Sequence, residues 1–359
     1  MYFCLLSRNR IVMESAFTYN CTATGLNFLS RKKELNQFVS LLGSGKNIVI
    51  YEPPRTGKSS LIETGFSALA KSGAGLRTIH FSLQRNISKD MLRDIFAEAL
   101  ENTTGNAAGI MDGTGVLQRL SEIPASSEGN ERIVLYIEEF QNIMKIEEWE
   151  DILHGYEKEW HSCKNISFIF TGSSVNSMKY IFEERKFFYN LFERIKLSPI
   201  EEKAVSDHII KTFLRVGRVV EPRHTERIYE VTDGHPWYIW QIANTCFNLT
   251  KGYLVDSIIE YAIDSVLSLH EVRFKEIINS LSYYQILLLK AIFEGKSKVN
   301  SSSVIEEYGL NSSANVHRLK EALTKKEVVI FDHQGNPAII DPMFRLWLER
   351  NYFIQNRKL

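Results

Sequence analysis

One segment near the N-terminus constrains the fold of this chain more than any other. The run Asn47–Tyr51 predicts a buried strand, and the sequence Glu-Pro-Pro-Arg-Thr-Gly-Lys-Ser-Ser follows it at positions 52–60. A strand, a tight loop and a helix start in this order are the setting of a phosphate-binding loop. Backbone N–H groups and the helix N-terminus present positive partial charge to a triphosphate. Lys58 would reach the β- and γ-phosphates, and the Ser59 hydroxyl would bind Mg²⁺.

One position departs from the full pattern of such a loop, because Glu52 stands where the first glycine is expected. A carboxylate aimed at phosphate would cost about 1–4 kcal/mol at a separation of about 4 Å. Position 52 directly follows the strand, so we expect its side chain to turn outward and nucleotide binding to survive. Because Pro53 and Pro54 restrain the loop, Glu52→Gly is predicted to change binding little or to tighten it. The alternative is a Gly-Lys-Ser turn that only opens a helix.

Composition and charge narrow the class of protein. The 359 residues carry equal numbers of basic and acidic side chains, so nucleic acid could bind only at a local patch. No apolar run approaches the roughly 20 residues of a membrane span. The cysteines are far apart and form no C-x-x-C pair, which argues against a zinc ribbon or a disulfide framework and favours a cytoplasmic protein. They are Cys4, Cys21, Cys163 and Cys246.

Strand and helix patterns alternate through the first 200 residues, which predicts a parallel sheet covered on both faces. The predicted strands are Asn47–Tyr51, Leu76–Leu83, Arg132–Ile137, Ile166–Thr171 and Arg194–Leu197. The predicted helices between them are Ser59–Lys71, Ser88–Asn102 and Glu147–His161. The fold class is therefore α/β.

From about residue 201 the strand patterns stop. Four helices are predicted at Glu201–Val216, Arg223–Thr232, Pro236–Thr250 and Val255–Asn279. The last 80 residues predict three helices and a hairpin, which together describe a winged helix: Tyr283–Phe293, Ser301–Tyr308, Ala314–Lys325, and strands Val328–Asp332 and Ala338–Asp341. The expected organisation is an N-terminal arm (1–25), a nucleotide-binding core (26–200), a helical lid (201–279) and a winged helix (280–359).

Polar residues follow two of the predicted core strands. Glu138 and Glu139 end one of them, and ligands gather at the carboxyl ends of parallel strands. Glu138 would lie near Mg²⁺ and Glu139 would polarise the attacking water; the alternative is a solvated acidic turn. The next strand runs into Gly172-Ser-Ser, so that Thr171 or Ser173 could lie near the γ-phosphate, although turn chemistry explains the same residues.

The order of these features resembles that of the archaeal-type ATPase family, a branch of the STAND group of AAA+ proteins (signal-transduction ATPases with numerous domains). The resemblance covers nearly the whole chain and is strongest at the phosphate loop. Ser30, Glu52 and Glu138 depart from the family pattern. The matching segments are Phe28-Leu-Ser-Arg31-x-x-Glu34, Pro54–Leu61, Glu138-Glu-Phe-Gln141, Gly172-Ser-Ser174, Gly234-His-Pro236 and Asp341–Trp347.

The resemblance implies a five-stranded AAA+ core, a helical lid and a winged helix. It further implies ATP and Mg²⁺ between core and lid, with hydrolysis acting as a conformational switch. Phe28 and Leu29 would border the adenine, Glu139 would be the catalytic acid, and Pro236 would close on the nucleotide from the lid. The remaining implied nucleotide or metal contacts are Pro54, Arg55, Thr56, Gly57, Lys58, Ser59, Ser60, Glu138, Ser173 and Arg194.

Three functions remain open at this point. The first is an ATP-binding switch with slow hydrolysis, the second a non-catalytic scaffold that only binds ATP or ADP, and the third an ATP-regulated DNA-binding protein. Residues 279–359 hold eleven basic and eight acidic side chains, a modest excess of three. Arg318 and Lys325 share one face of the helix Ala314–Lys325, while Val316 and Leu319 begin its core-facing stripe. We therefore rank DNA below packing on the core, on a protein partner or on a second copy.

Overall fold

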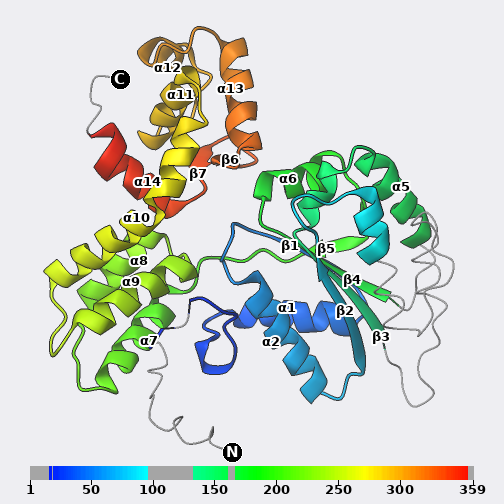
Figure 1. Cartoon of the computed structure of the whole chain (residues 1–359), viewed down its shortest axis with the longest axis horizontal. Coiled ribbons are helices and arrows are strands. Elements are labelled where there is room, and N and C mark those ends of the chain that lie inside the picture. Colours follow the sequence, from blue (N-terminus) through cyan, green and yellow to red (C-terminus); the bar gives the residue numbers. More distant parts are fainter. Residues whose placement is uncertain (1–15, 18, 96–131, 161–165, 355–359) are drawn as a thin grey trace, which may run out of the picture.

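The computed structural model describes residues 16, 17, 19–95, 132–160 and 166–354. In Figure 1 these residues form three regions: a core around a sheet, a bundle of helices beside it, and a C-terminal domain above the bundle. Part of the predicted arm, the second half of the predicted helix Ser88–Asn102 and the end of Glu147–His161 lie outside the described residues. No helix in the described ranges is long and apolar enough to cross a membrane.

The core holds a parallel sheet of five strands in the order β2-β3-β4-β1-β5. Four strands lie within one residue of their predicted bounds, whereas the fifth begins and ends earlier than predicted. Ile195 N still bonds to Val49 O, but Leu197 N donates to the Glu52 carboxylate, so the chain leaves the sheet there. The strands are β1 (Asn47–Tyr51), β2 (Leu76–Ser82), β3 (Arg132–Glu138), β4 (Ile166–Gly172) and β5 (Phe192–Arg194).

Helices cover both faces of the sheet, because alternate strand residues are apolar and buried on opposite sides. Ile48 and Ile50 pack with the helices α1 and α2, and Val49 packs on the other face. Helix α1 had no counterpart among the predicted helices. The helices of the core are α1 (Lys32–Gly43), α2 (Lys58–Lys71), α5 (Trp149–Trp160) and α6 (Val175–Lys179), with short turns of helix at Phe140–Lys145 and Tyr180–Glu184.

A linker without regular structure, residues 195–201, connects β5 to the helical bundle, which is the region predicted as the lid. The bundle helices lie within two residues of their predicted bounds. Pro222 and Pro236 open two of them, at the position where a helix tolerates proline. The last helix runs from the bundle into the C-terminal domain (Figure 1). The helices are α7 (Glu202–Leu214), α8 (Pro222–Thr232), α9 (Pro236–Leu249) and α10 (Asp256–Asn279).

The C-terminal domain is a winged helix, as predicted. Ser282, Ser301 and Ser312 each accept a backbone N–H at a helix start, which fixes where the three helices begin. Val316 and Leu319 are buried in its core. The elements are α11 (Tyr283–Phe293), α12 (Ser302–Glu307), α13 (Ser313–Lys325), β6 (Val329–Phe331), β7 (Pro337–Ile339) and α14 (Pro342–Trp347), followed by a helical turn at Leu348–Phe353.

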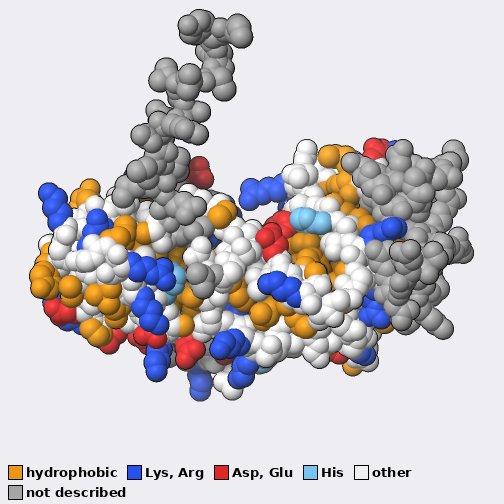
Figure 2. Space-filling model, turned by 90° about the horizontal axis from the view of Figure 1, so that it is seen from below, with side chains coloured by type: hydrophobic (Ala, Val, Ile, Leu, Met, Phe, Trp, Pro, Cys, Tyr) orange, Lys and Arg blue, Asp and Glu red, His pale blue; other side chains and the backbone are white. Residues whose placement is uncertain are grey.

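The winged helix packs on the core at the start of α6. The carboxylate of Glu327 accepts the backbone N–H groups of Asn176 (3.1 Å) and Ser177 (3.0 Å). The Asn176 amide donates to Thr324 O and to Val329 O, each at 3.0 Å. These bonds join segments about 150 residues apart in the sequence. In Figure 2, acidic and basic side chains are interspersed over the face shown, in keeping with the net charge of zero.

Candidate functional site

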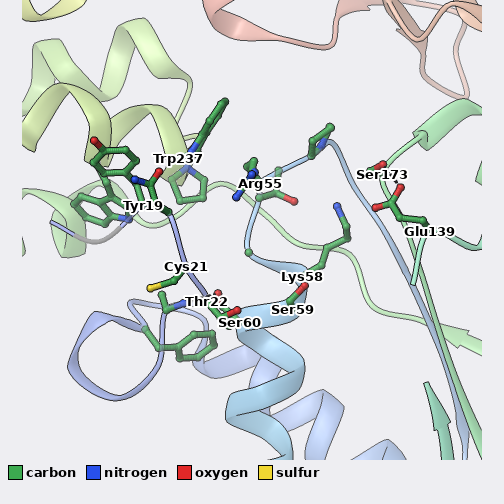
Figure 3. Close-up of a pocket in the computed structure, with 18 of the residues that line it drawn as sticks. Tyr19, Cys21, Thr22, Arg55, Lys58, Ser59, Ser60, Glu139, Ser173 and Trp237 are labelled. Carbon is green, nitrogen blue, oxygen red and sulfur yellow. Dashed lines mark hydrogen bonds between the residues drawn. The ribbon is translucent and has the colours of Figure 1, made fainter. Parts of the chain in front are cut away.

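A cavity of about 630 Å³ lies between the core and the lid, at the carboxyl edge of the sheet. Figure 3 shows Tyr19 and Trp237 toward one end, Glu139 and Ser173 toward the other, and Lys58 between them. All predicted site residues except Glu138 and Arg194 line it. The predicted residues that line it are Phe28, Leu29, Pro54, Arg55, Thr56, Gly57, Lys58, Ser59, Ser60, Glu139, Ser173 and Pro236.

The loop that we call the phosphate loop, residues 52–57, joins β1 to α2 and forms one wall of the cavity. Gly57 has a φ of 98°, a conformation that side chains rarely adopt. Arg55 also takes the left-handed conformation, with a φ of 64°. Helix α2 starts directly afterwards at Lys58, so its N-terminal N–H groups face the cavity. The arrangement is suited to an anion.

The Lys58 side chain is buried beneath this loop. Its Nζ donates to Glu52 O at 2.8 Å and to Pro53 O at 3.0 Å. Burial lowers the pKa of Lys58 to about 8, although the nearby carboxylates, Glu139 foremost, oppose the shift. An ammonium group held this way gains stability from any anion that enters the cavity, because its charge is poorly solvated.

Ser59 and Glu138 form a pair of oxygen ligands beside the loop. Ser59 Oγ donates to Glu138 Oε1 at 3.1 Å, and the Tyr136 hydroxyl donates to the same oxygen. His80 Nε2 lies 3.6 Å from Glu138 Oε2. The interaction with His80 is the main cause that lowers the pKa of Glu138 to about 2, against the opposing effect of burial. An ionised carboxylate next to a hydroxyl fits Mg²⁺, which prefers oxygen ligands.

Glu139 lies at the end of β3 with a φ of 54°. Its Oε2 accepts hydrogen bonds from Ser173 Oγ at 2.5 Å and from Gln141 Nε2 at 2.6 Å. Gly172 is needed here, because a Cβ at this position would lie 2.4 Å from Met178 Cγ. The carboxylate that follows β3 and the hydroxyl that follows β4 are thus brought together in one wall of the cavity.

Arg31 is a site residue whose contacts sequence analysis missed. Its buried guanidinium donates from Nη2 to Thr56 O at 2.8 Å and from Nη1 to Ser198 O at 2.9 Å. The only signal in the sequence was the motif Arg31-x-x-Glu34, whose two side chains lie 3.6 Å apart. Arg31 therefore connects the phosphate loop to the linker that leads to the lid.

The lid contributes two contacts that the sequence did not predict. His235 Nε2 lies 3.1 Å from Pro54 O, and burial lowers the pKa of His235 to about 4. A neutral imidazole can still donate this hydrogen bond through Nε2–H. The Arg55 guanidinium stands over the Trp237 ring, 5.4 Å from its centroid. The phosphate loop is thus in direct contact with the start of α9.

The N-terminal arm also reaches the cavity. Residues 19–23 line it, and Ala23 N donates to Ser60 Oγ at 3.0 Å. Tyr19 lies near the lid in Figure 3, and Trp240 of the lid also lines the cavity. Tyr19 and Trp237 therefore lie toward the end of the cavity at the lid, and Glu139 and Ser173 lie toward the other end.

Glu52 and Arg194 lie outside the cavity. The Glu52 carboxylate faces away from it, as expected, but it is buried in the protein and does not reach solvent. Arg194 Nη1 binds Glu183 Oε1 at 2.5 Å, and its guanidinium stacks 3.8 Å above the Tyr51 ring. These neighbours hold Arg194 at the edge strand β5, so the structure does not bring it to the predicted phosphate position.

Comparison with known proteins agrees with this architecture. A family described as a probable winged helix domain matches residues 272–350. No curated protein matches the chain. Among solved structures, a Walker-type ATPase of Pyrococcus abyssi is 15% identical with a TM-score of 0.65, over 93% of this chain and 99% of that one.

Two proteins of Aeropyrum pernix, ORC2 and ORC1, are also similar in structure. ORC2, solved in ADPNP-ADP complexes, is 17% identical with a TM-score of 0.59, over 96% of this chain and 98% of that one. ORC1, solved in complex with DNA, is 13% identical with a TM-score of 0.50, over 92% and 95%. At these identities the likeness shows the fold alone: a five-stranded parallel core of the AAA+ fold, a helical lid and a C-terminal winged helix.

Proposed function

We propose that this protein is an ATP-binding switch with slow Mg²⁺-dependent hydrolysis. One observation carries the proposal: Lys58, Ser59 and Glu139 line one cavity between the core and the lid, and Ser59 is hydrogen-bonded to Glu138. The domain division at residues 25, 200 and 279 and the STAND assignment belong to this proposal. They are supported by Pro236, which lines the cavity, and by His235, which contacts the phosphate loop at Pro54 O. A cytoplasmic setting also belongs to it, since Cys21 and Cys246 are free thiols.

The residues have distinct roles in this proposal. Phe28 and Leu29 border the base, Lys58 and the N-terminus of α2 hold the phosphates, and Ser173 lies where the γ-phosphate ends. When bound at Ser59 and Glu138, Mg²⁺ would neutralise phosphate charge. Glu139 accepts the proton of the attacking water. Ser173 and Gln141 already donate to Oε2 of Glu139, so this oxygen must share or exchange these bonds to engage a water molecule, which supports slow turnover.

Calorimetry of ATP–Mg²⁺ binding tests the proposal. The wild-type chain should release or absorb measurable heat with millimolar ATP, and Lys58→Ala should abolish it because the buried cation is removed. Lys46→Ala, a lysine outside the cavity, is the matched control and should bind like the wild type. A folded wild-type protein that shows no binding heat at millimolar ATP would contradict the proposal.

A second candidate is a non-catalytic scaffold that only distinguishes ATP from ADP. The two hydrogen bonds accepted by Glu139 favour it, because they hold the carboxylate away from a water molecule. Phosphate release separates the two functions. A wild-type rate equal to that of Lys58→Ala, in protein that binds ATP, would establish the scaffold.

DNA binding remains a third candidate. Arg318 and Lys325 are exposed on α13, and the similar ORC1 structure is in complex with DNA. The end of α13 packs against α6 in the present arrangement, through the bonds to Thr324 and Glu327. We therefore propose that this domain serves mainly to contact the core and a protein partner or second copy, with DNA as the lesser alternative.

A further inference from the structure

Position 52 does not need the glycine that a phosphate loop usually has there. The left-handed conformations of this loop fall on Arg55 (φ 64°) and Gly57 (φ 98°). At position 52 the chain carries a buried glutamate side chain, where the usual pattern has a glycine without a side chain. Glu52 Oε1 accepts the backbone N–H of Leu197 at 3.2 Å, and Arg194 Nη2 lies 4.0 Å away. The substitution therefore adds a contact at no cost in backbone strain.

The partner of Glu52 belongs to the linker 195–201, which leads from the sheet to the lid. The neighbouring linker residue, Ser198, receives the hydrogen bond from Arg31, whose other Nη group binds Thr56 O. The lid itself contacts Pro54 O through His235. Positions 52 and 54 of the phosphate loop are thus bonded directly to the linker and to the lid, and position 56 is joined to the linker through Arg31.

We propose that Glu52 is a positioning residue that fastens the phosphate loop to the core–lid linker, so that the loop and the lid meet the nucleotide in a fixed relation. The inference rests on the proposed nucleotide function. The Glu52 side chain itself does not line the cavity. It acts through the Leu197 N–H, which would be left buried and unpaired if the side chain were shortened.

Two measurements on the full chain test this role in Glu52→Ala, Glu52→Gly and Glu52→Gln. The first is ATP affinity. Alanine and glycine should weaken it about fivefold or more, because a buried N–H loses its acceptor. For glycine this replaces the expectation from the sequence, which did not include the contact with Leu197. Glutamine keeps an acceptor oxygen and should stay within about twofold of the wild type. Glu63→Ala, an exposed glutamate on α2, is the matched control. Thermal unfolding establishes that each variant is folded.

The second measurement is trypsin cleavage after Lys196, an exposed linker residue next to Leu197, without nucleotide. Alanine and glycine should accelerate this cut while cleavage elsewhere is unchanged, which a merely destabilised protein would not show. If wild-type protein fails to bind ATP, the proposed function fails, but the cleavage still tests the contact. Equal or tighter ATP binding by Glu52→Gly, an unchanged rate at Lys196, or a glutamine variant as weak as alanine would each overturn the positioning role.

Discussion

Glu52, which is buried, and Glu327, which is half-buried, each connect two segments that are far apart in the sequence. Each carboxylate accepts backbone N–H groups from a distant segment: Leu197 for Glu52, and Asn176 with Ser177 for Glu327. Burial is the main cause that raises the pKa of both. Because the folded-state pKa is raised, each group contributes stability that is present at low pH and lost as pH rises through that pKa.

The two differ in which parts of the chain they join and in how many acceptors they use. Glu52 uses one oxygen, has Arg194 beside it and acts inside the core and its linker. Glu327 uses both oxygens and joins two domains, so its contact can open without unfolding either one. Both contacts involve segments next to the cavity in the sequence. Glu52 starts the phosphate loop, and α6 begins two residues after the cavity residue Ser173. The comparison teaches that the same interaction, a carboxylate that accepts backbone N–H groups, can form a permanent contact at Glu52 and a separable contact at Glu327.

The largest expected effect concerns ATP hydrolysis at the cavity residue Glu139. Glu139→Gln should lower hydrolysis by about 10²–10⁴-fold and leave ATP binding nearly unchanged, since the amide keeps the shape but cannot act as a base. Phosphate release and calorimetry measure the two quantities, and Glu147→Gln, an exposed neighbour, is the control. Wild-type hydrolysis by the Glu139 variant would mean that this residue has another role.

The next effect tests whether the Glu327 contact is separable. Glu327→Ala should cost about 1–3 kcal/mol per buried N–H left unpaired. Hydrogen exchange at Asn176 and Ser177 should accelerate while the two domains stay folded. Glu327→Gln should restore only part of the lost stability, because an amide keeps one of the two acceptor oxygens. Glu52→Gln, in contrast, keeps the single acceptor oxygen that is used and should behave nearly as the wild type. Glu321→Ala, exposed on α13, should behave as wild type; unchanged exchange in the Glu327 variant would refute the contact.

A smaller effect concerns the pH dependence of ATP affinity, which we expect to follow the protonation of Lys58. The pKa of Lys58 is about 8 without ligand, and a bound triphosphate favours the charged ammonium. ATP affinity should therefore fall by up to about tenfold per pH unit above pH 8, with proton uptake on binding. Calorimetry at pH 8.5 in two buffers of different ionisation enthalpy measures that uptake. Lys46→Ala should show the same uptake, and its absence in wild-type protein would exclude Lys58 as the titrating group.

The smallest effect concerns the outer face of the winged helix. The full chain should bind duplex DNA weakly at low salt, and Arg318→Ala with Lys325→Ala should reduce the salt slope by about two. Filter binding or anisotropy across a salt series gives both values. Measurable affinity at physiological salt that the double variant loses would reverse our ranking and make the protein an ATP-regulated DNA binder.

Local signals in the sequence were enough for most elements of the fold. Apolar runs gave four strands within one residue, and helical patterns gave the three helices of the winged helix within one residue of their bounds. The cavity residues Lys58 and Glu139 were also predictable, because a phosphate loop and a strand end place them at the same sheet edge. Such features depend on neighbours only a few residues away.

Other features were decided only by the tertiary structure. The sequence could not show that Glu52 would point at Leu197, 145 positions away, or that Glu327 would reach the start of α6. The same holds for the end of β5 and for the position of Arg194. The physical reason is that these side chains bind backbone N–H groups or partners brought close by folding. Every residue except proline offers the same N–H group, so the sequence carries no mark of which one will be chosen.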